Sequence, residues 1–528
     1  MPDTRLVQLQ PAVPFSQSMV WELLARYFRE RGVAAWRDDE VPHYVTTNPF
    51  IGAAYAEVVF SAWSDLRRMG RWPDAGGQPL HICELGAGTG RLAFHFLRRL
   101  GELAAEAGLG QRTFRYVLTD TAEANLRFWE SHPALQRYFH SGVLDCARFD
   151  AARDDSLVLR RSRRALGSGG LGLPIVVIAN YVFDGLPQDL LHFDGLQASQ
   201  CHTSLWTAEP AAQDAGDLLG ALQYRFERRS LAPDAYPEPW LSRLVEGYRK
   251  ALADTHLLLP TSGLRCLHRL RELSPAGLLL LTADKGTHRL GELRGRGFPY
   301  VAHHGSISLD VNYHAIKAYC ENEGGQAWFP RAHHASLDIG ACLFAADAAH
   351  WHETRHACER HLHTFGPDDF YVVTRHAHET LATLQTRDIL AYLRLSRHDP
   401  HQCARYLPRL LELAPGFSAQ DRESVAAALE ASWAAYYPLG EEADLASCMG
   451  EVFLAMGDAE RALAAFMRSA QLYGHRADTV VDMAVCHCMA DRLPAARQLL
   501  GALLEREPGH RNALALQARL DAQPAVAA

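Results

Sequence analysis

Residues 82–91, Ile82-Cys83-Glu84-Leu85-Gly86-Ala87-Gly88-Thr89-Gly90-Arg91, decide the fold that we expect for this chain. A short apolar run ends at an acid, continues into glycines at alternate positions, and leads into an amphipathic segment over 92–100. Glycines suit such a turn because its backbone angles would strain residues with a Cβ, and because a ligand can approach the bare peptide groups. The pattern predicts a strand, a ligand-binding turn and a helix.

The spacing of these glycines narrows the class of ligand. It is Gly-x-Gly-x-Gly, whereas nicotinamide and flavin enzymes use Gly-x-Gly-x-x-Gly. With the preceding acid, the motif resembles the first motif of Rossmann-like S-adenosylmethionine-dependent methyltransferases, which implies S-adenosylmethionine as the cofactor. The alternative is a structural turn without a cofactor, since many α/β proteins need glycine after a first strand.

Length and composition exclude several classes of protein. A chain of 528 residues predicts several domains, and 48% hydrophobic with 22% charged residues is typical of a globular protein. The net charge of -8 argues against a generally basic nucleic-acid surface. No apolar run is long enough to cross a bilayer, and the first 16 residues show no signal pattern, so we expect a cytoplasmic protein. The eleven cysteines form no Cys-x-x-Cys pair and are expected to be free thiols.

Further strands are predicted downstream of the glycine turn. Apolar runs that end near acids or amides recur over 114–120, 142–144, 174–179 and 277–282. Their alternation with helical segments predicts an α/β fold with a Rossmann-like, mainly parallel sheet and right-handed crossovers.

The carboxyl ends of these strands supply the candidate site, because open α/β sheets bind ligands there. Asp120 ends the second strand and is expected to hold a ribose, although it or Thr121 could instead cap the next helix. Asp145 is placed near the adenine and Glu84 at the methionine part. The predicted cofactor-binding residues are Glu84, Gly86, Ala87, Gly88, Gly90, Asp120, Thr121 and Asp145. No metal ligand is predicted. Asn180 and Asp184, after the fourth strand, are expected to face the transferred methyl group.

The rest of the chain is predicted to form helical additions. Residues 1–75 are expected to be a helical cap, and 76–350 the methyltransferase domain with a helical insertion over about 205–273. Residues 370–528 are expected to be all-helical. With a shift of 34 residues, Gly450, Ala462 and Phe466 fall on Ala484, Ala496 and Leu500, and Ala391, Leu407 and Pro415 give a more divergent copy. This resembles tetratricopeptide repeats, which bind protein partners; a plain helical bundle is the alternative.

One metal motif is set aside. His352-Glu353-Thr354-Arg355-His356 matches H-E-x-x-H, but an arginine stands inside it and 27 histidines are spread through the chain. A polar helix face is the preferred interpretation.

The order of motifs is similar to that of the MidA-like, or DUF185, methyltransferase family, which includes a mitochondrial complex I assembly factor. The resemblance covers about residues 20–345 and rests on these segments: Thr46-Thr47-Asn48-Pro49, the glycine turn, Ala179–Pro187, Asp284-Lys285-Gly286 and Gly305–Tyr313. It implies S-adenosylmethionine binding, with protein arginine methylation as the activity of the mitochondrial member. Tyr181 replaces a family glutamate and Lys285 a family tyrosine.

These observations lead to one main hypothesis and two alternatives. The main one is a methyltransferase that modifies a protein, with arginine as one candidate acceptor, recruited through the repeat tail. The first alternative is a catalytically degenerate assembly or scaffold protein, which the changes at Tyr181 and Lys285 favour. The second, a nucleic-acid or small-molecule methyltransferase, is weaker, since the chain is acidic and lacks the Asn-Pro-Pro-aromatic motif after the fourth strand. No nucleic-acid or membrane partner is expected, and the sequence does not give the oligomeric state.

Overall fold

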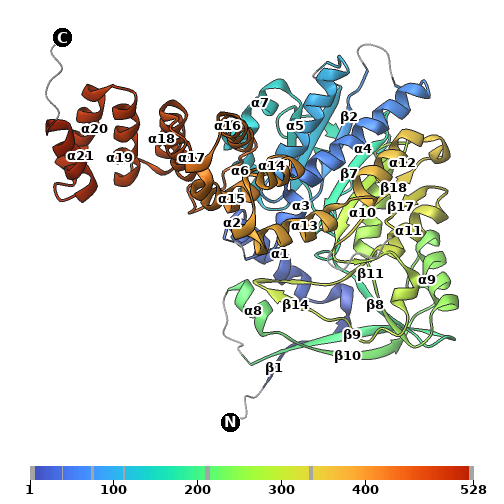
Figure 1. The fold of residues 1–528 in the computed structure, drawn as a ribbon. Coiled ribbons are helices and arrows are strands. Elements are labelled where there is room, and N and C mark those ends of the chain that lie inside the picture. The colour runs from blue at the N-terminus through green and yellow to red at the C-terminus, as the bar shows by residue number, and fades with distance from the viewer. Residues whose placement is uncertain are drawn as a thin grey trace. The chain divides into compact units, whose positions relative to one another are not determined.

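The structure is a computed structural model, and it describes residues 6–38, 40–72, 77–110, 113–208, 214–331 and 337–522. The chain forms two compact units, residues 1–369 and 370–528 (Figure 1). The first is a mixed α/β structure and the second consists of helices. The predicted fold class, α/β followed by an all-α tail, is confirmed.

A seven-stranded sheet forms the centre of the first unit. Its order is β17-β18-β12-β7-β2-β3-β4. The five strands from β12 to β4 are parallel, whereas β18 runs antiparallel to β12 and to β17. In order of appearance the strands are β2 (Leu80–Glu84), β3 (Phe114–Asp120), β4 (Leu144–Arg148), β7 (Ile175–Asn180), β12 (Leu278–Asp284), β17 (Gln326–Trp328) and β18 (Asp338–Phe344).

The central strands are continuous apolar runs because helices cover both faces of a parallel sheet. Every residue of β2 and β12 is buried, as are the first five of β7. The chain order reverses between β2 and β7, which pair directly. The strands β3 and β4 lie on one side of β2, whereas β7 and β12 lie on its other side. This reversal creates the crevice in which open α/β sheets bind ligands.

Helices connect these strands and cover the sheet. The helices after the glycine turn and the later strands are α5 (Arg91–Glu106), α6 (Glu123–Ser131), α7 (Pro133–Ser141), α10 (Thr261–Glu272), α11 (Tyr313–Asn322) and α12 (His352–Cys358). Preceding the sheet are α1 (Val20–Arg31), α2 (Ala34–Arg37), α3 (Tyr44–Thr47) and α4 (Pro49–Arg68). The start of α4 follows from its sequence: the Asn48 side chain accepts a hydrogen bond from Ile51 N at 3.1 Å, and Pro49 fits the first helical position.

A second sheet corrects the prediction of a helical insertion over 205–273. It has the order β1-β9-β8-β11, with β10 on β9, and all its pairs are antiparallel. Its strands are β1 (Val7–Pro14), β8 (Asp189–Phe193), β9 (Ala198–Thr207), β10 (Gln223–Ser230) and β11 (Thr255–Leu259). Among the described residues of the predicted range, which leave out 209–213, only α8 (Ala215–Ala221), α9 (Pro239–Ala251) and α10 are helical. Residues 7–14, within the predicted helical cap, are likewise extended rather than helical, since they form β1.

The physical reason for this error lies in the side chains that β9 buries. From Cys201 onward, alternate residues are buried, and two of these, Thr203 and Thr207, are polar. The two-residue period of the strand is therefore hidden from a search for alternating apolar residues.

The second unit contains helical hairpins that agree with the predicted repeats. The main helices are α14 (Thr386–Leu395), α15 (Pro400–Leu413), α16 (Ala419–Ala434), α17 (Leu445–Ala455), α18 (Ala459–Tyr473), α19 (Ala477–Met489), α20 (Leu493–Arg506) and α21 (Arg511–Ala522). All six residues of the 34-residue match, Gly450, Ala462, Phe466, Ala484, Ala496 and Leu500, are buried. The divergent copy is wrong in its register, because Ala391 is exposed while its neighbour Ile389 is buried.

No helix among the described residues is long and apolar enough to cross a membrane. All eleven cysteines are free thiols, and nine of them are buried.

Candidate active site

The glycine turn adopts the backbone conformation that its sequence requires. Gly86, Gly88 and Gly90 have φ angles of 58°, 53° and 75°, in the left-handed region that favours glycine. Ala87, between them, is buried, and its N–H donates to the Thr119 carbonyl at 2.9 Å. The turn is thus fixed against β3, and Gly90 begins α5.

Asp120 anchors this turn from the end of β3. Its carboxylate accepts hydrogen bonds from Gly88 N at 3.2 Å, Ala122 N at 2.9 Å and Asn125 Nδ2 at 2.8 Å. Burial raises the pKa of Asp120, and these hydrogen bonds oppose the rise. Asp120 therefore caps the start of α6 and holds the glycine turn, which was the alternative role considered for it.

Glu84 lies below the turn and is fully enclosed. The Tyr116 hydroxyl donates to its Oε2 at 2.8 Å. Burial raises the pKa of Glu84 to about 8 despite this hydrogen bond. At neutral pH the carboxyl is therefore mostly protonated, and a nearby cation would favour its ionised form.

Asp145 does not reach the crevice, which corrects its predicted place near the adenine. Both its oxygens bind backbone amides: Oδ1 accepts from Cys146 N at 2.8 Å and Arg161 N at 2.9 Å, and Oδ2 from Ser162 N at 3.0 Å. It holds the 160–162 loop against β4. The strand continues to Arg148, so the acid at its carboxyl end is Asp150, which follows Phe149.

A pocket of about 500 Å³ lies at the reversal of strand order. The turn and strand ends contribute Gly86, Asp120, Thr121, Phe149 and Asp150, and the segment after β7 contributes Tyr181, Val182 and 185–187. The N-terminal segment closes it with Trp21, Phe28 and Trp36. Of the predicted cofactor residues, Gly86, Asp120 and Thr121 line the pocket.

Asp150 and the aromatic side chains Trp21, Phe28 and Trp36 of this pocket were not among the residues predicted from the sequence. Asp150 follows the same rule that selected Asp120, an acid at the end of a strand, and was overlooked because the third strand extends further than expected. Trp36 gave no signal, because it comes from the N-terminal segment. Its ring lies directly against Gly88, with atoms 3.1–3.3 Å from the position that a Cβ on Gly88 would take.

Asn180 is engaged by two residues of the N-terminal helices. Its Oδ1 accepts a hydrogen bond from the Tyr55 hydroxyl at 2.8 Å, and its Nδ2 donates to the Thr46 carbonyl at 3.3 Å. The amide thus ties the sheet edge to α3 and α4.

Two acids from distant parts of the chain, the partly exposed Asp184 and the buried Asp284, come together beside the pocket. Because β12 pairs with β7 so that Ala283 is beside Asn180, the next residue, Asp284, lies at the same edge as the 181–187 segment. There it lies close enough to Asp184 for the charge of that residue to raise its pKa. Asp284 Oδ2 is a buried oxygen without a hydrogen-bond partner among the described residues. Asp284 Oδ1 also accepts from Lys285 N at 2.8 Å.

Burial favours the protonated forms of both acids. Burial raises the pKa of Asp184 to about 7, and burial together with the negative charge of Asp184 raises the pKa of Asp284 further. Tyr181, with φ of 51°, and Tyr313 lie close enough for the acids to add to the effect of burial in raising their hydroxyl pKa values. The result is a pair of acids with raised pKa values beside two phenols whose hydroxyl pKa values are also raised.

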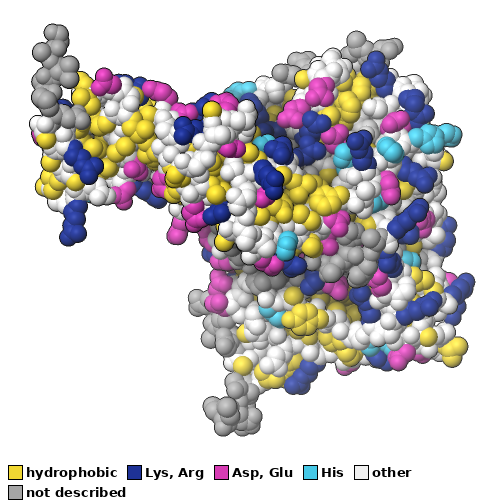
Figure 2. Space-filling model, viewed as in Figure 1, with side chains coloured by type: hydrophobic (Ala, Val, Ile, Leu, Met, Phe, Trp, Pro, Cys, Tyr) yellow, Lys and Arg dark blue, Asp and Glu magenta, His cyan; other side chains and the backbone are white. Residues whose placement is uncertain are grey.

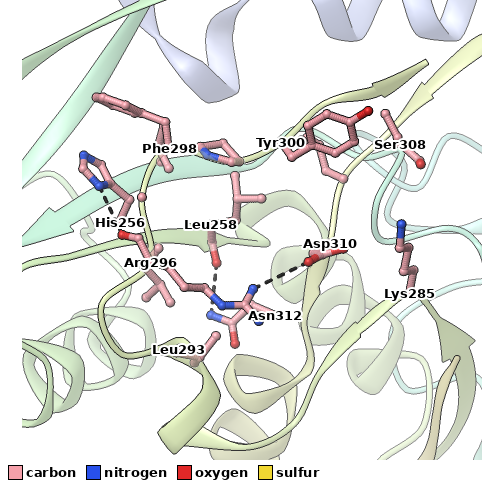
Figure 3. A pocket seen from close by; sticks show the side chains of 16 residues that line it. His256, Leu258, Lys285, Leu293, Arg296, Phe298, Tyr300, Ser308, Asp310 and Asn312 are labelled. Atoms are coloured by element: carbon pink, nitrogen blue, oxygen red, sulfur yellow. Dashed lines mark hydrogen bonds and ion pairs between the residues drawn. The ribbon is translucent and has the colours of Figure 1, made fainter. Parts of the chain in front are cut away.

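Lys285 lines a second pocket, of about 370 Å³. Lys285 lies at one end of it and His256 at the other, with Arg296 and Asp310 between them (Figure 3). Arg296 and Asp310 form an ion pair at 3.7 Å. His256 accepts from Arg228 Nη2 and donates to the Arg296 carbonyl, which fixes it as a neutral ring.

His352 and His356 of the H-E-x-x-H motif are both exposed on α12. Within the described ranges, no group of three or more His, Cys, Asp or Glu side chains is placed to hold a metal ion.

Comparisons with known proteins support the repeats predicted in the tail and also find solved structures that resemble part of the chain. Residues 453–520 match the family model of the tetratricopeptide repeat, so the tail contains such repeats. No curated protein matches the chain. Among solved structures, a COG1565 superfamily protein from Burkholderia thailandensis is 18% identical with a TM-score of 0.38, covering 60% of this chain and 73% of its own.

Two further structures contain S-adenosyl-homocysteine. A COG1565 superfamily member and likely methyl transferase from Burkholderia thailandensis is 16% identical with a TM-score of 0.39, covering 68% of this chain and 86% of its own. Magnesium protoporphyrin IX methyltransferase from Synechocystis PCC 6803 is 14% identical with a TM-score of 0.28, covering 61% and 98%. Since these TM-scores are below 0.5, the fold assignment rests on the strand order of this chain itself.

Proposed function

We propose that the first unit is an S-adenosylmethionine-dependent methyltransferase of the MidA-like kind, and that the repeat tail recruits its protein substrate. The observation that carries this proposal is the pocket at the reversal of strand order, with a bare glycine turn on one side and the segment holding the acid pair on the other. Such a crevice is where open α/β sheets bind nucleotide-like ligands.

The residues of the pocket fit this cofactor. Gly86 of the left-handed turn is exposed and lines the pocket, and Asp120 and Asp150 end neighbouring strands where ribose and adenine groups are held in this class of fold. Phe28, Phe149 and Trp36 provide apolar, planar walls for an adenine ring. Glu84, beneath the turn, would become ionised beside the cationic amino group of the methionine part.

When bound, S-adenosylmethionine supplies a methyl group activated by a sulfonium. The acceptor nitrogen must be held in line with that methyl group and must lose a proton. We assign both tasks to Asp184 and Asp284, because two adjacent acids with raised pKa values can hold one proton between them, which leaves one carboxylate free to accept a hydrogen bond and then a proton. Asn180 is assigned a positioning role, since both ends of its amide bind the N-terminal helices.

Arginine is the acceptor side chain that we propose. Its guanidinium keeps its charge up to a pKa above about 12, so its site needs a carboxylate to bind and polarise it. With one proton bound, the acid pair has one net negative charge and two oxygen-bearing groups, which match two N–H donors of a guanidinium. Tyr181 and Tyr313 leave this charge uncompensated, because their hydroxyls are neutral.

The tail provides apolar surface suited to a protein partner. Large apolar side chains are exposed on α18, α19 and α21: Met467, Leu472, Met489 and Leu514, with exposed fractions of 44–50%. Figure 2 shows hydrophobic side chains gathered on the face of the tail that it displays. Stacked helical hairpins bind peptides through such surfaces.

Calorimetric titration of the full-length protein with S-adenosylmethionine tests the cofactor, and label transfer from the methyl-labelled cofactor to lysate proteins tests the acceptor. We expect Asp184→Asn and Asp284→Asn to retain binding within about threefold while transfer falls by about 100-fold or more. Absence of binding by the folded wild-type protein would overturn the proposal. Labelled lysine instead of arginine would remove only the acceptor assignment.

A scaffold without catalysis is the second candidate function. The observation that favours it is the use of Asp120 and Asn180 by the protein's own donors, which reduces the groups available to a ligand. Binding of cofactor without any label transfer to any protein would support this candidate.

A further inference from the structure

A basic pocket lies apart from the candidate active site. Its volume is about 600 Å³, and it is bounded by η2 (Leu290–Leu293) with the two residues before it, by α11, by β17 with residues 329–331, and by α12 with η4 (Glu359–His363). It shares no lining residue with the crevice pocket or with the Lys285 pocket. Lys, Arg and His side chains are frequent on the surface above these elements (Figures 1 and 2).

The charges that line this pocket are strongly unequal. Four cationic residues, Arg289, Lys317, Arg331 and Arg355, contribute to it, against a single acid, Glu359. This excess of positive charge occurs in a chain whose net charge is -8. Charges on the protein surface are screened over about 8 Å in physiological salt, and four cations that line one pocket therefore act together to raise the local positive potential.

The acids near the pocket are already engaged with other groups. Glu359 bonds to His363 Nδ1 at 3.3 Å, and Asp338 to His288 Nδ1 at 2.8 Å. Glu292 lies 3.8 Å from Arg289, whose guanidinium also donates to the Arg331 carbonyl.

Three of the cations have no such partner. Within the described ranges, the side chains of Lys317, Arg331 and Arg355 make no ion pair or hydrogen bond with the protein. Three cationic donors are therefore available to a ligand.

A buried polar atom points to the same conclusion. The His363 side chain is 6% exposed and lines the pocket, and its Nε2 has no hydrogen-bond partner among the described residues. Leaving a buried polar atom unpaired costs about 1–3 kcal/mol. A phosphate group could pair with it in either state, since its O–H can donate to a neutral ring and its other oxygens can accept from an imidazolium.

We propose that this pocket binds the phosphate group of a small molecule. Guanidinium groups match phosphate oxygens with two parallel hydrogen bonds, and a lysine adds a further charge, so the donor set favours a multiply charged tetrahedral anion over a carboxylate. Trp328 and Phe329 line the same pocket, and Phe329 stacks on His288 with ring centres 5.0 Å apart. The volume exceeds that of a phosphate alone, and it leaves room for an organic body against these rings.

Calorimetric titration of the full-length protein with pyrophosphate, at constant ionic strength, tests this proposal. We expect binding that weakens by about tenfold or more in the double variant Arg331→Gln/Arg355→Gln, because two charge-assisted contacts are lost. Arg360→Gln is the matched control, since Arg360 belongs to the same short helix as Glu359 and His363 but does not line the pocket. The control should bind as the wild type does.

Two outcomes would overturn the proposal: no heat of binding by the wild type at about 1 mM pyrophosphate, or an equal loss in Arg360→Gln. Unchanged thermal unfolding of each variant confirms that its fold is retained. Repeating the titration with ADP distinguishes the sources of the phosphate. Tighter binding of ADP that returns to the pyrophosphate level in Trp328→Leu indicates an aromatic phosphate ester, whereas equal affinities indicate an inorganic anion.

Discussion

The glycine turn of the first unit and the repeats of the tail both place an aromatic ring directly against a glycine. In the turn, a Cβ on Gly88 would lie 3.1 Å from the Trp36 ring, and in the tail a Cβ on Gly450 would lie 2.6 Å from the Phe466 ring. The backbone differs: Gly88 has a φ of 53°, whereas Gly450 lies within the helix α17. The surroundings differ too, since Phe466 is fully buried in a packed core and Trp36 lines a pocket.

This comparison separates two uses of glycine. In the tail, glycine only makes room for close helix packing, so its replacement should affect stability alone. In the turn, glycine also supplies a left-handed backbone conformation against the pocket-lining ring of Trp36, so its replacement should affect ligand binding. The predictions below test this separation.

The largest effect is expected from Gly88→Val. A branched side chain at this φ strains the turn and collides with Trp36, so affinity for S-adenosylmethionine should fall by more than about 100-fold in calorimetry. Gly324→Val is the control, because Gly324 has a φ of 79° and no atom within 4 Å of its Cβ position. Equal affinity losses in the two variants would show that strain alone is responsible.

The buried acids of the first unit should make its stability fall as pH rises. Because the folded-state pKa of Glu84 is raised from 4.5 to about 8, the folded state binds more protons than the unfolded state between these values. We expect the free energy of unfolding to decrease by about 4 kcal/mol across this range from Glu84, and Glu84→Gln to remove that part of the slope.

Urea unfolding at several pH values, followed by tryptophan fluorescence, measures this slope. Nine of the ten tryptophans precede residue 370, so the signal reports mainly on the first unit. Glu106→Gln, at an exposed position, should keep the wild-type slope. A flat stability profile for the wild type would contradict the prediction.

The packing of the tail is tested by replacing glycine with alanine at two positions, one packed and one open. Gly450→Ala should lower tail stability by about 2 kcal/mol, because the new Cβ collides with Phe466. Gly501→Ala should raise it by about 0.5–1 kcal/mol, because Gly501 is an exposed helical glycine with free space around it. Circular dichroism during thermal unfolding gives both changes. Neither variant should alter cofactor affinity, and a loss of binding in Gly450→Ala would break the separation of the two uses of glycine.

The smallest effect is expected from Tyr55→Phe, which removes the hydrogen bond to Asn180. Loss of one such bond, worth about 0.5–1.5 kcal/mol, should weaken cofactor binding by about threefold to tenfold, because Asn180 connects the sheet edge to the N-terminal helices. Tyr300→Phe, at a residue that is 81% exposed, is the control in the same titration. A larger effect in the control would rule out this role of Asn180.

Much of the fold could be predicted because its signals are local. The buried strands β7 and β12 are unbroken apolar runs, and the left-handed turn is written in three glycines. The two repeats share small and large residues at matching positions, all of them buried. The second sheet escaped prediction because β9 buries threonines, whose polarity conceals the strand period.

The candidate site was predicted less completely. We expected an acid at the end of a strand to line the pocket, and this is correct for Asp120. The end of β4 was predicted too early, so Asp145 was chosen in place of Asp150. A boundary error of a few residues exchanges a pocket acid for one that holds a loop. Trp36 could not be found in this way, because its place depends on how the N-terminal segment folds back.

The sequence by itself determined the strand–turn–helix unit, the parallel sheet and the helical repeats, because hydrophobic periodicity and glycine conformation are properties of neighbouring residues. Only the tertiary structure decided the state of the charged groups. The pKa values of Asp184 and Asp284 are raised because the ends of two strands meet and exclude water, and the basic pocket exists because α11, β17 and α12 bring their cations together. Charge and desolvation act between residues far apart in the chain, so neither can be read from the sequence around a single residue.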